Sequence, residues 1–182
     1  MKTIIFGLLA VVAASASLAS SAQAQYSPAQ YYNKFIPTLS LADQKAQAMN
    51  LRGLQYCLSQ QGKVVGKGYS EDLANMHLAA SGAIPADFRD RRNYVWGAVP
   101  NGWAPGDVLQ FEECYFEWKE GNRKFAVHME HHTAVIASIH KDSVVELVHQ
   151  KGPNGAAVVV EKLDLKTKQR GTIRGWRPVG GN

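Results

Sequence analysis

The sequence predicts an α+β protein whose helices precede an antiparallel sheet, and two observations carry this prediction. Between residues 41 and 81, leucine, alanine and methionine recur at helical spacing. After residue 106 the chain divides into short runs rich in β-branched and aromatic residues, which turn formers such as Gly121-Asn122 separate. Helices followed by a series of strands are typical of α+β domains. From residue 25 onward the chain contains no internal repeat, low-complexity tract or dividing linker, so we expect one domain.

Residues 1–24 have the features of a cleaved secretory signal. Lys2 supplies a positive charge, residues 4–14 are apolar with one glycine, and Ala22-Gln23-Ala24 is a small-residue cleavage site. The apolar run is too short for a membrane span, and a retained N-terminal anchor is the alternative. We therefore expect a secreted or periplasmic protein with a lead-in at residues 25–44 and a domain at residues 45–180. Cleavage leaves 158 of 182 residues, which is enough for one hydrophobic core. No later segment has the 18 consecutive apolar residues that could span a membrane.

Two helices are predicted in the first half of the domain. The first covers residues 41–60, and residues 40–43 resemble a capping box at its start. A loop with three glycines follows at residues 62–68. The second helix begins near Ser70, carries Glu71 and Asp72 in its first turn, and ends at Gly82. Residues 84–106 are expected to be irregular because three prolines interrupt them.

Seven short strands are predicted after residue 106. They cover residues 108–111, 115–118, 124–128, 133–139, 144–148, 157–163 and 172–177.

Charge and cysteine content limit the possible partners. The formal net charge is +5, and loss of Lys2 with the signal lowers it to +4. The only dense basic cluster is Arg89, Arg91 and Arg92, without the interleaved aromatic residues typical of nucleic-acid binding. We expect loose attraction to an anionic polymer or cell envelope and no nucleic-acid partner. The two cysteines, Cys57 and Cys114, could form one disulfide worth roughly 4 kcal/mol, or be two separately buried thiols.

Ser70 is the first candidate for chemistry. At a helix start, unpaired backbone N–H groups can stabilise an anion such as the oxyanion of an acyl intermediate. A cysteine would gain most from this position, whereas a serine hydroxyl needs a well-placed base. The structural alternative is an N-cap whose Oγ only accepts a backbone hydrogen bond.

Histidines near two strand ends are the next candidates. His131 and His132 precede a run suited to a buried strand, so one of them can face a cleft as a general base while its neighbour faces the other side. A structural histidine is the alternative. His149-Gln150 ends the following strand and could orient that base. His128, Glu130 and His132 share strand parity, but three ligands from one flat strand do not converge on a metal. No cofactor or metal is therefore expected.

The order of these segments resembles the papain-like amidohydrolases and peptidases of the CHAP and NlpC type. The segments that carry the resemblance are residues 66–74, Pro105-Gly106-Asp107 with the strand after it, His132-Thr133-Ala134-Val135-Ile136, Val148-His149-Gln150, Tyr94-Val95-Trp96-Gly97 and Trp176-Arg177-Pro178. The resemblance covers roughly residues 45–178. It implies N-terminal helices packed on a C-terminal antiparallel sheet or half-barrel, with a nucleophile at a helix start and a histidine on the sheet.

Carried over to this sequence, the resemblance places the nucleophile at Ser70, the base at His132 and the third residue at His149 or Gln150. Such families attack amide carbonyls, often in peptidoglycan. Two residues depart from the family pattern. Ser70 replaces the expected cysteine, and Lys151 stands where an asparagine often follows the motif at residues 148–150. Cys57 cannot replace the missing thiol because it precedes the glycine loop and lies in a predicted helix.

Three functions are compatible with this sequence. The first is a secreted papain-like protein that binds or acts on cell-envelope peptides, peptidoglycan or another amide-containing polymer, with cysteine-type catalysis weakened or lost. The second is an active amidase or peptidase that uses Ser70 with His132. The third is a structural or interaction protein with a cleft that has no function.

Overall fold

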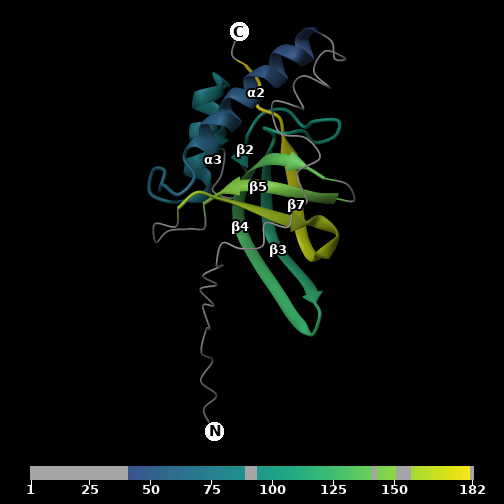
Figure 1. Ribbon diagram of the computed structural model, residues 1–182. Helices are drawn as coiled ribbons and strands as arrows, with labels where there is room; N and C mark the ends of the chain where they lie inside the picture. The colour runs from purple at the N-terminus through teal and green to yellow at the C-terminus, as the bar shows by residue number, and fades with distance from the viewer. Residues whose placement is uncertain (1–40, 89–93, 141–142, 151–156, 181–182) are drawn as a thin grey trace.

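The computed structural model describes residues 41–88, 94–140, 143–150 and 157–180 (Figure 1). The predicted signal, most of the lead-in and the arginine cluster at residues 89–92 lie outside the described residues. Within the described part of the chain, no helix has the length and apolar character that a membrane span needs.

The two predicted helices are confirmed. Helix α2 covers Leu41–Ser59 and helix α3 covers Ser70–Ser81. The second ends at Gly82, whose left-handed backbone (φ 75°) lets its N–H bond the last carbonyls of the helix. The helices pack on each other and lie together on one side of the sheet (Figure 1).

A five-stranded antiparallel sheet forms most of the remaining described part of the domain. Its strands are β3 (Val108–Glu120), β4 (Arg123–Ile139), β5 (Val144–His149), β6 (Val159–Asp164) and β7 (Lys168–Trp176), in the order β6-β5-β4-β3-β7. A short 3-10 helix, η3 (Leu165–Thr167), joins β6 to β7. Because β4 is much longer than β5, the outer half of the β3–β4 hairpin extends beyond the neighbouring strands (Figure 1).

The predicted strand boundaries are wrong in several places, and β7 begins at Lys168 where the predicted strand begins at residue 172. The expected breaks at residues 112–114 and 129–132 do not exist, because β3 and β4 pair along nearly their whole lengths. The expected break at residues 112–114 corresponds to a β-bulge in β3. Glu113 there has a positive φ of 50°, and the register between β3 and β7 shifts beside it. In addition, the segment expected to be irregular contains two short paired strands, β1 (Asp87–Phe88) and β2 (Tyr94–Val95).

The same irregularity changes which side chains share a face. Met129 and His132 both contact the apolar cluster that contains Phe111. In a regular strand, residues three positions apart face opposite sides. The prediction that His128, Glu130 and His132 share one face is therefore wrong. Among the described residues, no group of three or more His, Cys, Asp and Glu side chains is arranged to hold a metal.

Two apolar clusters lie on the two sides of the sheet. The first joins α2 and α3 to the sheet through residues such as Leu54, Leu73 and Val135. The second, around Phe111 and Ile136, draws side chains from all five strands. The sheet thus curves around the second cluster in the manner of a half-barrel (Figure 1).

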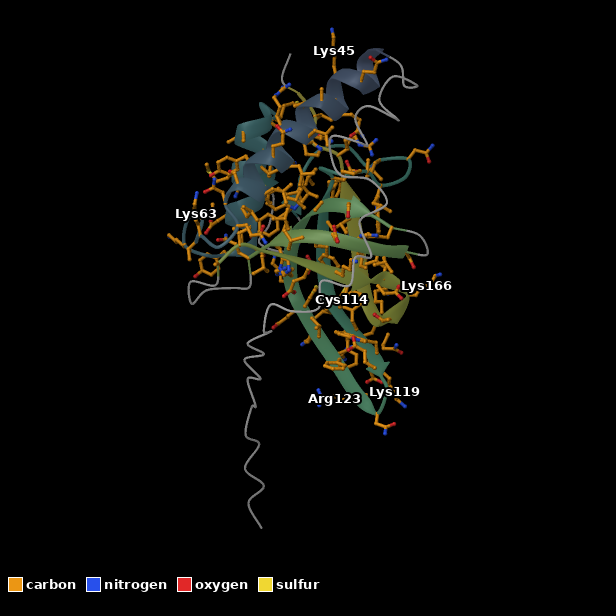
Figure 2. All side chains as sticks on the ribbon, in the orientation of Figure 1. Lys45, Lys63, Cys114, Lys119, Arg123 and Lys166 are labelled. Carbon is orange, nitrogen blue, oxygen red and sulfur yellow. The ribbon has the colours of Figure 1, made fainter. Side chains whose placement is uncertain are left out.

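The two cysteines belong to different clusters, and both thiols are free. Cys57 lies between the helices and the sheet, whereas Cys114 lies on the sheet beside the bulge (Figure 2). Of the two alternatives, the structure therefore has separately buried thiols and no disulfide.

The Pro-Gly-Asp segment anchors the start of β3 to the C-terminal end of the chain. Gly106 has a φ of 91° and lies so close to Asn50 of α2 that a side chain there would collide with it. Asp107 is fully buried, and its carboxylate receives two hydrogen bonds from the Arg177 guanidinium at 2.9 and 2.8 Å. Burial raises the pKa of Asp107, and Arg177 opposes this shift. The resemblance motifs at residues 105–107 and 176–178 thus meet in space.

Candidate functional site

Ser70 is the first residue of α3, and Asp72 fixes the loop before it. The Asp72 carboxylate accepts hydrogen bonds from the backbone amides of Lys67 (2.7 Å) and Tyr69 (3.2 Å). Gly66 has a φ of 59°, and a side chain there would collide with Asp72. Tyr69 occupies the N-cap position, so the interpretation of Ser70 as the N-cap is wrong.

Gln150 holds the same loop from the sheet. Its side-chain oxygen accepts a hydrogen bond from the Val65 amide (2.6 Å), and its NH₂ donates to the carbonyls of Val65 (3.2 Å) and Tyr69 (2.9 Å). The side chain is fully buried. Gln150, one of the two candidates for the third catalytic residue, therefore holds the loop before Ser70 in place.

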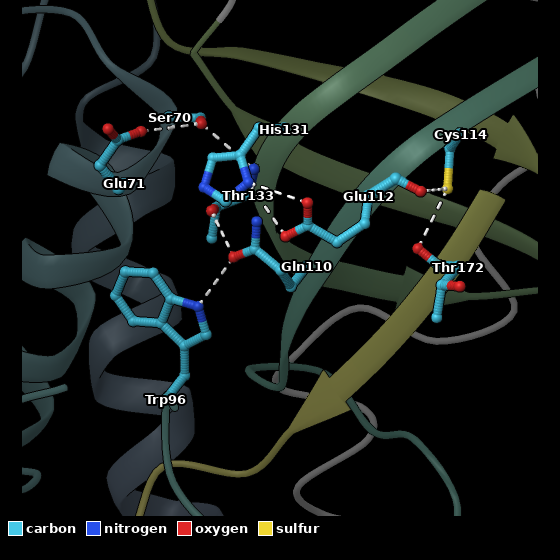
Figure 3. A network of polar contacts seen from close by, with 9 residues as sticks. All are labelled: Ser70, Glu71, Trp96, Gln110, Glu112, Cys114, His131, Thr133 and Thr172. Atoms are coloured by element: carbon cyan, nitrogen blue, oxygen red, sulfur yellow. Dashed lines mark hydrogen bonds and ion pairs between the residues drawn. The ribbon is translucent and has the colours of Figure 1, made fainter. Parts of the chain in front are cut away.

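The Ser70 hydroxyl lies between strand β4 and the first turn of α3. Its Oγ accepts a hydrogen bond from the Thr133 amide (3.1 Å) and donates one to the Glu71 carboxylate (3.2 Å) (Figure 3). The residue is 5% exposed. Neither of these partners is the His132 imidazole, which a serine nucleophile would need as its base.

His132 and His149 form a direct pair. Nε2 of His132 lies 2.9 Å from Nδ1 of His149, with the two ring planes at 89°. On its other side, Nε2 of His149 lies 3.4 Å from the Glu161 carboxylate. The three side chains form a series in which a carboxylate orients one imidazole and that imidazole orients the next. Nε2 of His132 is therefore engaged by His149.

His131 faces the helices and belongs to a separate network. Its Nδ1 lies 3.0 Å from the Glu112 carboxylate, and its ring contacts Tyr94. Beside it, the side-chain oxygen of Gln110 accepts hydrogen bonds from Thr133 Oγ1 (2.9 Å) and Trp96 Nε1 (3.1 Å) (Figure 3). This network ties β2 to the strand that positions Ser70.

These residues open onto one cleft of about 470 Å³, a size typical of ligand sites. It is lined by the start of α3, one stretch of β4 and the ends of β5 and β6: Tyr69, Ser70, Glu71, Val127, His128, Met129, Glu130, His131, His132, His149 and Glu161. The structure therefore brings together Ser70, His132 and His149, and places Gln150 behind the loop.

Two acidic residues of this site were not singled out from the sequence. Glu112 lies directly opposite His131 in the β3–β4 pair. Counting back from the two-residue turn at residues 121–122 gives that pairing, so a signal for Glu112 existed. Glu161 pairs with Leu147 across β5 and β6.

A comparison with known families gives a match over most of the chain. The profile of the AIM3/BBC1 cysteine proteinase-fold domain matches residues 52–182, which include α3 and the whole sheet. The chain belongs to this family. No curated protein and no solved structure matches it. The family assignment confirms the papain-like fold that the sequence predicts, with its helices and antiparallel sheet.

In this AIM3/BBC1 cysteine proteinase-fold domain, neither cysteine lines the cleft. Burial raises the pKa of Cys57 to about 12, and burial also raises the pKa of Cys114. A nucleophilic thiol needs the opposite shift, because only the thiolate attacks. The chemistry of the cleft therefore depends on Ser70, the histidines and the carboxylates.

Proposed function

We propose that this domain binds peptides of the cell envelope in its papain-like cleft, with catalysis weakened or lost. One observation carries the proposal: the Ser70 hydroxyl is held by the Thr133 amide and the Glu71 carboxylate. Its proton points to Glu71, so the oxygen is not poised for deprotonation by His132. A cleft with a helix start, a histidine pair and a strand edge still offers hydrogen-bonding groups that suit a peptide.

The proposal that the ligand comes from the cell envelope rests on residues 1–24, which have the features of a secretory signal, and on the resemblance to CHAP and NlpC proteins. The scattered positive charge suits an anionic surface: the labelled basic residues Lys45, Lys63, Lys119, Arg123 and Lys166 spread over the molecule (Figure 2). Peptides of peptidoglycan are therefore the first ligands to test.

A second candidate function is a serine amidase or peptidase. It is favoured by the Glu161–His149–His132 series, which resembles the orienting half of a catalytic triad. In this reaction the Ser70 oxygen attacks an amide carbonyl, and its proton passes through His132 to the leaving amine. Water then hydrolyses the acyl-serine, which regenerates Ser70 and releases the carboxylic acid. The first step requires the Ser70 hydroxyl to turn from Glu71 to His132.

Three forms of the protein separate these functions: wild type, Ser70→Ala and Ser70→Cys. Each is assayed for cleavage of peptidoglycan fragments and small amide substrates, and for binding of the same fragments by calorimetry. We expect wild type and Ser70→Ala to bind without turnover. We expect Ser70→Cys to gain cleavage, because a thiolate at a helix start needs less help from a base.

Ser59→Cys is the matched control, since Ser59 is exposed on α2 and lies outside the cleft. It should gain no activity. Wild-type cleavage that disappears in Ser70→Ala would establish the serine enzyme instead. Absence of both binding and cleavage in all forms would reject both functions and leave a cleft without a function.

A further inference from the structure

We propose that the ligand is an extended peptide with cationic side chains, which adds as a strand to the free edge of β4 at residues 126–130. The inference rests on the proposed function, because it takes the ligand to be a peptide. It adds how the peptide is held and which side chains it carries.

The first observation is an unpaired strand edge beside the cleft. Strand β4 pairs with β5 only from Val135 to Ile139, whereas it pairs with β3 down to Arg123. Among the described strands, none pairs with the opposite edge of β4 over residues 123–132. The cleft follows this edge, since six consecutive residues of β4, 127–132, line it. Consecutive residues from both faces of a strand share a cleft only when the cleft runs along the strand's edge.

The second observation is the direction of the backbone groups. The two-residue turn pairs Glu120 with Arg123, and the residues that flank such a turn bond each other. Counting from that pair in steps of two, Val127 and Met129 bond to β3. The N–H and C=O groups of His128 and Glu130 therefore point to the free edge, where a peptide strand can pair with them.

The third observation is charge. The cleft is lined by the carboxylates Glu71, Glu130 and Glu161, and none of its described lining residues is lysine or arginine. This is opposite to the net charge of +5 for the whole chain. Glu130 is exposed on the strand edge, whereas Met129 beside it is half-buried. A peptide that alternates basic and apolar residues thus matches both kinds of position.

The position of Ser70 connects this edge to the site. Farther along β4, beyond the irregularity, the Thr133 amide is already used by the Ser70 hydroxyl. A peptide strand that follows the edge toward α3 therefore ends at Ser70 and His132. Its terminal amide would meet the start of the helix, where unpaired N–H groups can receive a carbonyl oxygen.

The test uses an acetylated and amidated heptapeptide that alternates valine and lysine, and the full-length protein. Calorimetry gives its Kd, and hydrogen exchange gives the protection of each backbone amide. We expect the amides of His128 and Glu130 to exchange freely without peptide and to be protected with it. Amides of Val127 and Met129 should be protected in both states. The same peptide with glutamate in place of lysine should bind at least about tenfold more weakly.

Two substitutions at one position separate the backbone from the side chain. His128→Pro removes the outward N–H, and proline is tolerated where a strand edge faces solvent. His128→Ala removes the same imidazole and keeps the N–H. We expect His128→Pro to weaken binding by about tenfold relative to His128→Ala. Lys119→Ala, an exposed change outside the cleft, is the unaffected control, and circular dichroism checks that all variants fold.

The outcomes distinguish this inference from the proposed function. Equal binding by His128→Pro and His128→Ala, or unprotected edge amides in the complex, would overturn strand addition. If the heptapeptide binds in this way but peptidoglycan stem peptides do not, strand addition stands and the envelope function falls. If stem peptides bind without protecting the backbone amides of His128 and Glu130, the envelope function stands and strand addition falls. Edge amides already protected before peptide is added would assign the edge to a segment of this chain and overturn the proposal.

Discussion

Nε2 of His132 and Nδ1 of His149 are 2.9 Å apart, and this contact joins the end of β5 to the part of β4 that lines the cleft. One of the two nitrogens donates and the other accepts, so the bond fixes the tautomers of both rings. Glu161 lies beside the remaining nitrogen of His149 and sets the polarity of the pair. The contact therefore fixes the orientation of His132, one of the residues that line the cleft.

The first prediction concerns this pair. His149→Phe keeps a ring at the site but removes the partner of His132. We expect the ¹⁵N signals of His132 at about pH 8, above the ordinary histidine range, to change from one tautomer to a mixture. Long-range ¹H–¹⁵N spectra measure this directly. The signals of His140, which contacts Glu146 on another part of the sheet, should stay in place. An unchanged His132 tautomer would show that His149 does not orient it.

The second prediction concerns the loop before Ser70. Gln150→Ala removes the partners of the Val65 amide and of the Val65 and Tyr69 carbonyls. We expect a loss of roughly 2–3 kcal/mol in the free energy of unfolding, because buried backbone groups are left unpaired. Urea denaturation measures the loss, and faster exchange of the Val65 amide localises it. Gln55→Ala on the exposed side of α2 should change stability by less than about 0.5 kcal/mol.

The third prediction compares two ion pairs. Arg177→Ala leaves the fully buried Asp107 carboxylate without its guanidinium partner. We expect this change to cost roughly 3–5 kcal/mol. Lys124→Ala breaks the Lys124–Glu117 pair, whose lysine is 59% exposed, and should cost far less because solvent screens this pair. Similar losses for the two variants would show that Asp107 does not depend on Arg177.

The fourth prediction concerns pH. His77 is fully buried in α3 against the backbone of Gly53, and burial lowers its pKa from 6.5 to about 4. Between these values the unfolded chain binds a proton that the folded chain does not, so stability falls as the pH drops from 6.5 toward 4. At pH 7 both states are neutral at this position, and the effect is absent.

The size of this loss is about 3 kcal/mol when the pKa shift is converted to free energy. Denaturant unfolding at a series of pH values measures it, and His77→Leu is the comparison because it cannot titrate. We expect the acid-dependent loss to be smaller in His77→Leu by about that amount. Parallel pH profiles for the two proteins would mean that His77 is protonated in the fold.

The two helices, the glycine that ends α3 and the antiparallel character of the sheet were predictable because they depend on local patterns. Ser70 at a helix start and Gly82 at a helix end are examples. The strand boundaries were harder, since Glu113 adopts a positive φ that nothing in its neighbours indicates. That bulge and the irregularity opposite it separate Met129 from the face that simple alternation assigns to it.

The sequence selected candidate residues for the site but not their contacts. The order of motifs selected Ser70, His132, His149 and Gln150, but their partners come from distant parts of the chain. Glu161 lies beside His149 only because β6 pairs with β5 in one particular register. Gln150 follows β5 directly and binds the loop before α3.

By itself the sequence determined the fold class and the start of α3, because each depends on residue type and short-range spacing. Only the tertiary structure decided that the Ser70 hydroxyl bonds Thr133 and Glu71, and that a strand edge stays open beside it. The physical reason is that hydrogen-bond partners and strand edges depend on register and on the packing of α3 against β4. Neither is a property of a single segment.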